Sequence, residues 1–189
     1  MVAKKLVKTA GSCKIIFISR IVPKKNLTFA LNVLKNVKGE ITFDIYGAKE
    51  DLDYWKKCER LIDNLPPNIT VTYCGLAPHQ EVNSIFQRYD VLLFPTHSEN
   101  YGHVIIESLL AGCPVIISDQ TPWNDVNATG AGWAIPLNKP SDFSNALQKV
   151  IDADSDRYRV NAKLFVNKKL NLDALKKDYE AVFIKIRNR

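Results

Sequence analysis

The sequence predicts a doubly wound α/β domain, in which a parallel sheet carries helices on both faces in a Rossmann-like arrangement. Short apolar runs alternate along the chain with stretches of helical periodicity, as in ITFDIYG followed by LDYWKKCERLI. Strands that are apolar throughout are typical of parallel sheets buried on both sides. Their regular alternation with helices favours crossover connections rather than hairpins, and therefore this fold class.

Six strands and seven helices are expected from this pattern. The expected strands are residues 13–19, 41–47, 69–74, 90–94, 114–118 and 133–136. The expected helices are residues 26–37, 52–62, 81–89, 102–110, a segment from Ser141 or Asp142 to 151, and segments near 155–166 and 172–187. A serine or aspartate can cap a helix by accepting a hydrogen bond from a free backbone N–H, which is why the fifth helix is placed there.

Composition describes one globular domain without targeting or membrane segments. The chain has 189 residues, of which 46% are hydrophobic and 24% charged. The basic start MVAKKLVKTAGSC lacks an apolar core, and no apolar run reaches the length of a membrane span, so a cytoplasmic location is expected. The four cysteines are widely and irregularly spaced, which favours free buried thiols over a zinc site or disulfides.

Positive charge is concentrated at the C-terminus. Residues 157–189 hold ten Lys or Arg against three acids, a net of +7, whereas residues 1–156 carry 16 basic and 17 acidic residues. Such a segment suits an anionic membrane surface, with peripheral attachment at its inner face, or an acidic partner domain. A solvated helix face remains equally open. Nucleic-acid binding is a weaker alternative, since few aromatic residues accompany the charges.

The segment after the fourth expected strand carries the most chemistry. Ligands of doubly wound sheets bind beyond the carboxyl ends of the strands. There, Gly102 permits a tight turn into a helix whose first N–H groups form an anion site suited to a diphosphate. Glu99 precedes this helix and Glu107 lies within it. A carboxylate can accept two hydrogen bonds from a vicinal diol, although a solvated Glu107 is the simpler reading of that residue alone.

Two cations follow the first expected strand. Arg20 and Lys25 lie on either side of Pro23, at a carboxyl end of the sheet. They could neutralise a diphosphate leaving group and stabilise its developing charge. In a chain with 26 Lys and Arg residues, two ordinary surface cations are the competing explanation.

Weaker patterns have structural explanations that compete with functional ones. Asp51 and Asp53 form a D-x-D pair, a metal motif elsewhere, but acids also favour helix starts. His97 and His103 flank Glu99 without a convincing metal set. Trp123 could border the site, or simply pack in the core.

The ordered set of motifs resembles the donor half of glycosyltransferase family 4. The set comprises Arg20 and Lys25, a strand that ends at Gly47, Gly75 in VTYCG, and ENYGHVIIESLLAGCPVI. The resemblance covers roughly residues 13–155. It implies a retaining transferase of the GT-B fold, which has two Rossmann-like domains. Only the C-terminal one is expected here, so an N-terminal acceptor-binding domain would be the partner.

The resemblance also implies roles for individual residues. Arg20 and Lys25 match the basic pair on the donor phosphates, and Glu99 matches the glutamate that faces the donor sugar. The implied donor-binding positions are Gly75 and Leu76 at the base, Asn100, Tyr101 and Gly102 at the sugar, His103 and Val104 at the diphosphate, and Glu107 at the ribose. No metal and no other cofactor is implied, since the family acts without one.

Three residues depart from the usual family pattern, which often has glycine where this chain has Ser19, Asn26 and Ala48; no phosphate role is therefore carried over to Ala48. The chain divides into an N-terminal extension (1–12), a nucleotide-sugar-binding domain (13–155) and basic C-terminal helices (156–189). The function expected is donor binding for transfer of a sugar to an acceptor hydroxyl, in polysaccharide or glycolipid biosynthesis. A nucleotide-sugar-binding module without catalysis, and half of a sugar-nucleotide epimerase, remain alternatives.

Overall fold

A computed structural model of the chain describes residues 8–154 and 156–171. Six parallel strands form a single sheet in the order β3-β2-β1-β4-β5-β6. The strands are β1 (Ser12–Ile18), β2 (Glu40–Tyr46), β3 (Ile69–Gly75), β4 (Val91–Phe94), β5 (Val115–Ser118) and β6 (Gly132–Ile135). Every pairing is parallel, and the chain reverses direction across the sheet between β1 and β4. The doubly wound class expected from the sequence is confirmed.

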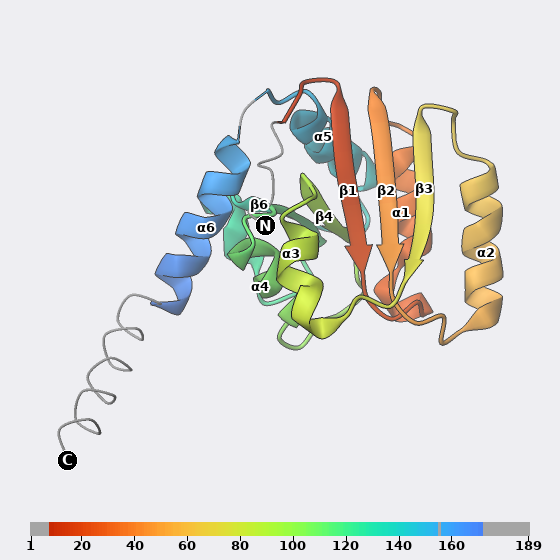
Figure 1. Cartoon of the computed structure of the whole chain (residues 1–189), viewed down its shortest axis with the longest axis horizontal. Coiled ribbons are helices and arrows are strands. Elements are labelled where there is room, and N and C mark those ends of the chain that lie inside the picture. The colour runs from red at the N-terminus through yellow and green to blue at the C-terminus, as the bar shows by residue number, and fades with distance from the viewer. Residues whose placement is uncertain (1–7, 155, 172–189) are drawn as a thin grey trace, which may run out of the picture.

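Helices cover both faces of this sheet. The α-helices are α1 (Leu27–Leu34), α2 (Leu52–Asp63), α3 (Val82–Phe86), α4 (His103–Leu110), α5 (Pro140–Ile151) and α6 (Arg157–Leu170). Three 3-10 turns connect them: η1 (Pro23–Lys25), η2 (His79–Glu81) and η3 (Asn124–Ala128). In Figure 1, α1 and α5 lie behind the strands, α3 and α4 lie in front of β4, and α6 packs beside α4.

The core lies between the strands and these helices. Phe17, Phe43, Phe94 and Phe143 are fully buried, and the rings of Phe17 and Phe94 meet at 5.9 Å between centroids. Cys13, Cys58 and Cys113 are free, buried thiols, as expected, and Cys74 is half-buried. Because burial penalises the thiolate, it raises the pKa of Cys58 and of Cys113 to about 12.

Strands β2 and β3 are not apolar on both sides. In β2 the side chains alternate, so that Ile41, Phe43 and Ile45 are buried whereas Thr42 is exposed; in β3, Thr70 and Thr72 are exposed on the same sheet face as Thr42. Such alternation is typical of a sheet face that meets solvent. Half of one sheet face therefore lacks a helical cover within the described residues.

Several expected helix boundaries were wrong. Helices α1 and α3 end at Leu34 and Phe86, three residues before their expected ends at residues 37 and 89. Helix α5 begins at Pro140 rather than at a Ser141 or Asp142 cap, because proline presets the backbone for the first helical turn. Helix α6 continues to Leu170, past the expected end at 166, and stops at Asn171 with φ 49°. The last expected helix, residues 172–187, lies outside the described residues, as does most of the basic segment.

Candidate functional site

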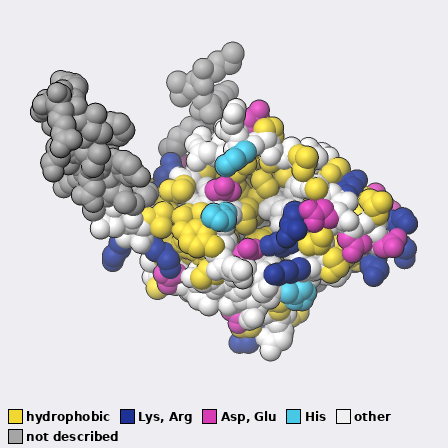
Figure 2. Space-filling view, turned by 90° about the horizontal axis from the view of Figure 1, so that it is seen from below, with side chains coloured by type: hydrophobic (Ala, Val, Ile, Leu, Met, Phe, Trp, Pro, Cys, Tyr) yellow, Lys and Arg dark blue, Asp and Glu magenta, His cyan; other side chains and the backbone are white. Residues whose placement is uncertain are grey.

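A cavity of about 500 Å³ opens at the carboxyl edge of the sheet, across the switch point between β1 and β4. This is where doubly wound sheets bind their ligands. Its lining comprises Ile18, Ser19, Arg20, Lys25, Gly47, Ala48, Leu76, Ala77, His79, Val82, Phe94, Glu99, His103, Val104 and Glu107. Figure 2 shows this edge, where basic, acidic and histidine side chains gather among hydrophobic ones.

Lys25 and Glu99 form a close ion pair in the cavity wall. Lys25 Nζ donates to Glu99 Oε2 at 2.5 Å, and their side chains are only 10% and 20% exposed. The ammonium also lies 5.4 Å from the ring centroid of Phe94. The backbone holds both partners: Asn26, with φ 59°, ends η1 after Lys25, and Glu99 N–H donates to Gln120 O at 3.0 Å. Low exposure makes this charge pair stronger than a surface pair.

Arg20 and Glu107 are the other two charged residues of the predicted site that line the cavity. Arg20 Nη1 donates to Glu50 Oε2 at 3.2 Å, but its side chain is 62% exposed and free to exchange partners. Glu107 is half-buried in the second turn of α4 and lines the cavity, which excludes a fully solvated helix face for it.

The start of α4 supplies backbone donors to the same cavity. Gly102 is the N-cap, with φ 80°, a conformation that favours glycine. The next two residues, His103 and Val104, both line the cavity. The first N–H groups of a helix have no acceptor within it and lie at the positive end of its dipole. The helix start therefore favours a negatively charged group in the cavity.

Gly47 brings three strand ends together beside these charges. A Cβ at Gly47 would lie 1.7 Å from Ser19 O, so only glycine fits between β1 and β2 here. The N–H of Gly47 donates to Gly75 O at 2.7 Å, and Ile21 N–H donates to Ala48 O at 2.8 Å. The backbone of the cavity floor is thus fixed by the close approach of the strand ends.

The structure brings most of the predicted residues into one cavity wall. Those that line it are Arg20, Lys25, Leu76, Glu99, His103, Val104 and Glu107. Gly75, Asn100 and Gly102 do not line it but are next in the chain to residues that do, and the ring of Tyr101 lies 4.8 Å from that of His103. His79 and Val82 also line the cavity, although the sequence predicted no role for either; His79 lies in the segment after the third strand, where the fold places ligand contacts.

For the D-x-D pair and for Trp123, the structure agrees with the structural explanation rather than with a role in binding. Asp51 is the N-cap of α2, where its Oδ1 accepts from Tyr54 N–H at 2.8 Å, so the D-x-D pair opens a helix. Trp123 is buried and packs in the core, although its indole N–H reaches the loop before α4.

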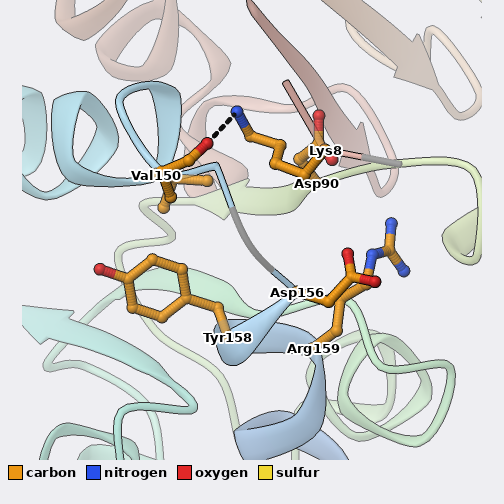
Figure 3. A pocket seen from close by; sticks show the side chains of 7 residues that line it. Lys8, Asp90, Val150, Asp156, Tyr158 and Arg159 are labelled. Carbon is orange, nitrogen blue, oxygen red and sulfur yellow. Dashed lines mark hydrogen bonds between the residues drawn. The ribbon is translucent and has the colours of Figure 1, made fainter. Parts of the chain in front are cut away.

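A second, small hollow lies at the opposite edge of the sheet and is lined by side chains with structural contacts (Figure 3). Its volume is about 10 Å³, room for about one water molecule. Lys8 Nζ donates to Ile151 O and Ala153 O at 3.0 and 3.1 Å, and Asp90 Oδ2 accepts from Lys14 N–H at 2.8 Å. These bonds tie chain segments together at the amino edge and leave the carboxyl edge as the candidate site.

Comparison with known protein families identifies the family to which the chain belongs. The family described as "Glycosyl transferases group 1" matches residues 3–164, most of the chain and all of the cavity. The chain is a group 1 glycosyl transferase domain. The sequence resemblance is thereby confirmed at this level.

Two relatives of known name are much longer than this chain. The GtfA subunit of the UDP-N-acetylglucosamine–peptide N-acetylglucosaminyltransferase of Streptococcus agalactiae is 26% identical over 129 residues, covering 66% of this chain and 24% of the relative. Sulfoquinovosyl transferase SQD2 of Arabidopsis thaliana is 28% identical over 165 residues, covering 84% of this chain and 30% of the relative. The matched part of the chain thus spans 24% and 30% of the length of these two relatives.

Solved structures share the fold at low sequence identity. Anabaena Alr3699/HepE, crystallised with UDP and glucose, has a TM-score of 0.75 and 16% identity, covering 93% of this chain and 49% of that one. The C-terminal domain of the group 1 protein LpcC of Francisella tularensis has a TM-score of 0.68 and 21% identity, covering 86% of this chain and 88% of that one. The glycosyl transferase domain described here is therefore similar in extent to a C-terminal domain solved on its own.

Proposed function

We propose that this domain binds a nucleoside diphosphate sugar in the carboxyl-edge cavity and serves as the donor half of a retaining glycosyltransferase. The observation that carries the proposal is the convergence of Arg20, Lys25, Glu99 and Glu107 on one cavity at the start of α4. The diphosphate of such a ligand is negatively charged and suits the cations Arg20 and Lys25. Its ribose and sugar carry hydroxyl groups and suit the carboxylates Glu99 and Glu107. Group 1 membership and the UDP found in the related Alr3699/HepE structure support it.

The diphosphate is assigned to the start of α4. His103 and Val104, the first two residues of α4, line the cavity and have N–H groups without an acceptor in the helix, and Arg20 lines the cavity with a side chain that is largely exposed. Positive charge that is already in place stabilises the diphosphate as it leaves, so no metal ion is required in this proposal. Lys25 adds to this field while it holds Glu99.

The two glutamates are assigned to hydroxyl groups on either side of the diphosphate. Glu107, half-buried in α4, accepts hydrogen bonds from the ribose diol. Glu99, held through its own N–H, faces the transferred sugar, with the backbone at Asn100, Tyr101 and Gly102 beside it. The base lies toward Gly75 and Leu76, and Leu76 is 71% exposed at that end of the cavity.

Transfer of the sugar also requires an acceptor and a protein surface that binds it. We propose that a second, acceptor-binding domain closes over the cavity and that the sugar passes to an acceptor hydroxyl with retention at the anomeric carbon. The short coverage of the longer relatives supports this. We also propose that the enzyme acts in the cytoplasm, in polysaccharide or glycolipid biosynthesis, with the basic C-terminal segment on an anionic membrane surface. No described helix is long and apolar enough to cross a membrane.

The test is calorimetric titration of the domain with UDP, GDP and ADP and their glucose conjugates. We expect saturable binding of one nucleotide, weakened roughly tenfold to a hundredfold by Glu107→Gln and by Arg20→Ala, because each loses a hydrogen bond to or from a charged group. Glu40→Gln and Arg60→Ala, both exposed and away from the cavity, are the matched controls and should bind as the wild type does.

A different result would distinguish the alternatives. Equal loss in the control variants, or binding untouched by Glu107→Gln, would contradict the assigned site. Binding as proposed, but no sugar transfer when the acceptor domain is supplied, would favour a nucleotide-sugar-binding module without catalysis.

A further inference from the structure

Trp123 touches the loop that leads into α4 and is not among the residues that line the cavity. It is 3% exposed, and its Nε1–H donates to Tyr101 O at 2.6 Å. Its ring meets that of Tyr101 edge-on at 6.2 Å. A Cβ at Gly102 would lie 3.1 Å from Trp123 Nε1, so the indole packs directly against the N-cap.

The same indole is held from behind by α6. Phe165 packs edge-on against Trp123 at 6.4 Å. Lys169 Nζ lies 5.0 Å from the centroid of the Trp123 ring and bonds to Asp125 Oδ2 at 2.5 Å. Asp125 belongs to η3, the turn that follows Trp123. Helix α6 and η3 therefore pack around the indole, and the indole packs against the loop that precedes α4.

We propose that Trp123 is a positioning residue that fixes the donor-sugar loop, residues 99–102, and that α6 acts on this loop through it. Glu99, at one end of this loop, is held by Lys25 and by Gln120 O, whereas Asn100 is exposed and Tyr101 is 48% exposed. An anchored carbonyl at Tyr101 sets where the turn at Gly102 begins, and hence where the first N–H groups of α4 point.

Preorganisation explains why such an anchor would matter. A loop that must be ordered on binding costs affinity, whereas a loop already held in place does not. This role rests on the proposed donor site for its effect on nucleotide binding. Its effect on the loop itself does not depend on any ligand, so the two ideas can fail separately.

The test replaces Trp123 by phenylalanine, which keeps an aromatic ring and removes the indole N–H. We expect amide hydrogen exchange at residues 100–104 to accelerate roughly threefold to tenfold, as loss of one hydrogen bond predicts. The affinity for the bound nucleotide sugar should fall by a similar factor. Trp133→Phe is the matched control, because Trp133 also packs on α6, against Tyr158 at 5.1 Å, but lies on β6.

A second pair of variants tests the contribution of α6. Lys169→Gln removes the bond to Asp125 and the cation over the indole, and should accelerate exchange in the same loop. Lys168→Gln, at the exposed neighbouring position, should leave it unchanged.

Equal exchange rates in Trp123→Phe and Trp133→Phe would overturn the positioning role, whatever happens to binding. Faster loop exchange with no nucleotide bound by the wild type would instead contradict the proposed function and leave the positioning role in place. Faster exchange with unchanged affinity would overturn the link between loop order and donor binding.

Discussion

Lys25 and Glu99 stabilise the folded protein as an ion pair, and either charge without the other destabilises it. Because their side chains are 10% and 20% exposed, removing one leaves the other charge largely buried without its partner. We expect Lys25→Met to lower the free energy of unfolding by about 1–3 kcal/mol, and Glu99→Gln to act similarly. The double variant should lose less than the sum of the two, which urea unfolding of all four proteins would measure. Strictly additive losses would show that the ion pair contributes no coupling energy.

Residue types and their positions predicted this pair as site residues, but not as partners. The two lie 74 residues apart, and their contact depends on η1 and on the Glu99 loop meeting at one edge of the sheet. The bond from Trp123 to Tyr101 was missed for the same reason, since it joins segments that follow different strands. A sequence pattern indicates which groups reach an edge; the turns decide which of them touch.

Gly47 shows what a close approach between elements requires. Gly47→Ala would place a methyl group 1.7 Å from Ser19 O, and the φ of 142° is unfavourable for any side chain. We expect this variant to lose more than about 3 kcal/mol of stability or to fail to fold, because β1 and β2 must separate to admit it.

Gly75→Ala is the matched control, with a φ of 73° but no atom within 4 Å of the added carbon. It should cost only about 1–2 kcal/mol, the strain of a left-handed alanine. Thermal unfolding of both variants would compare these costs. Similar losses would mean that backbone strain, rather than the contact with Ser19, makes glycine necessary at Gly47.

Helices and strands were predicted correctly where the local sequence pattern determines them. All six strands lie within one or two residues of their expected positions, because apolar runs end at Gly, Pro or polar residues. Where tertiary contacts decide, prediction failed. The last turn of α6 is stabilised by Lys169, whose partner Asp125 belongs to a distant turn. The uncovered face of β2 and β3 likewise depends on how the helices are arranged. The run ITFDIYG was interpreted as apolar throughout, although its buried and exposed residues alternate.

At the scale of the whole molecule, the buried thiols link folding to alkaline pH. Cys58 and Cys113 ionise near 9.0 when exposed but only near 12 in the fold, because burial penalises the thiolate. The folded state therefore holds protons that the unfolded state has released above pH 9. Stability from these groups is fully present below pH 9 and is lost as the pH rises toward 12.

We expect the urea midpoint of the domain to fall between pH 8 and pH 10.5 and to fall less steeply in a Cys58→Ala, Cys113→Ala double variant. The comparison of slopes removes the contribution of the tyrosines and lysines, which titrate in both proteins. Cys74→Ala is the matched control: its thiol is half-buried and its pKa is raised less far, so it should leave the slope closer to that of the wild type. Parallel slopes in all three proteins would mean that these thiols ionise in the folded domain as readily as in the unfolded chain, and that the core around α2 and β5 admits solvent.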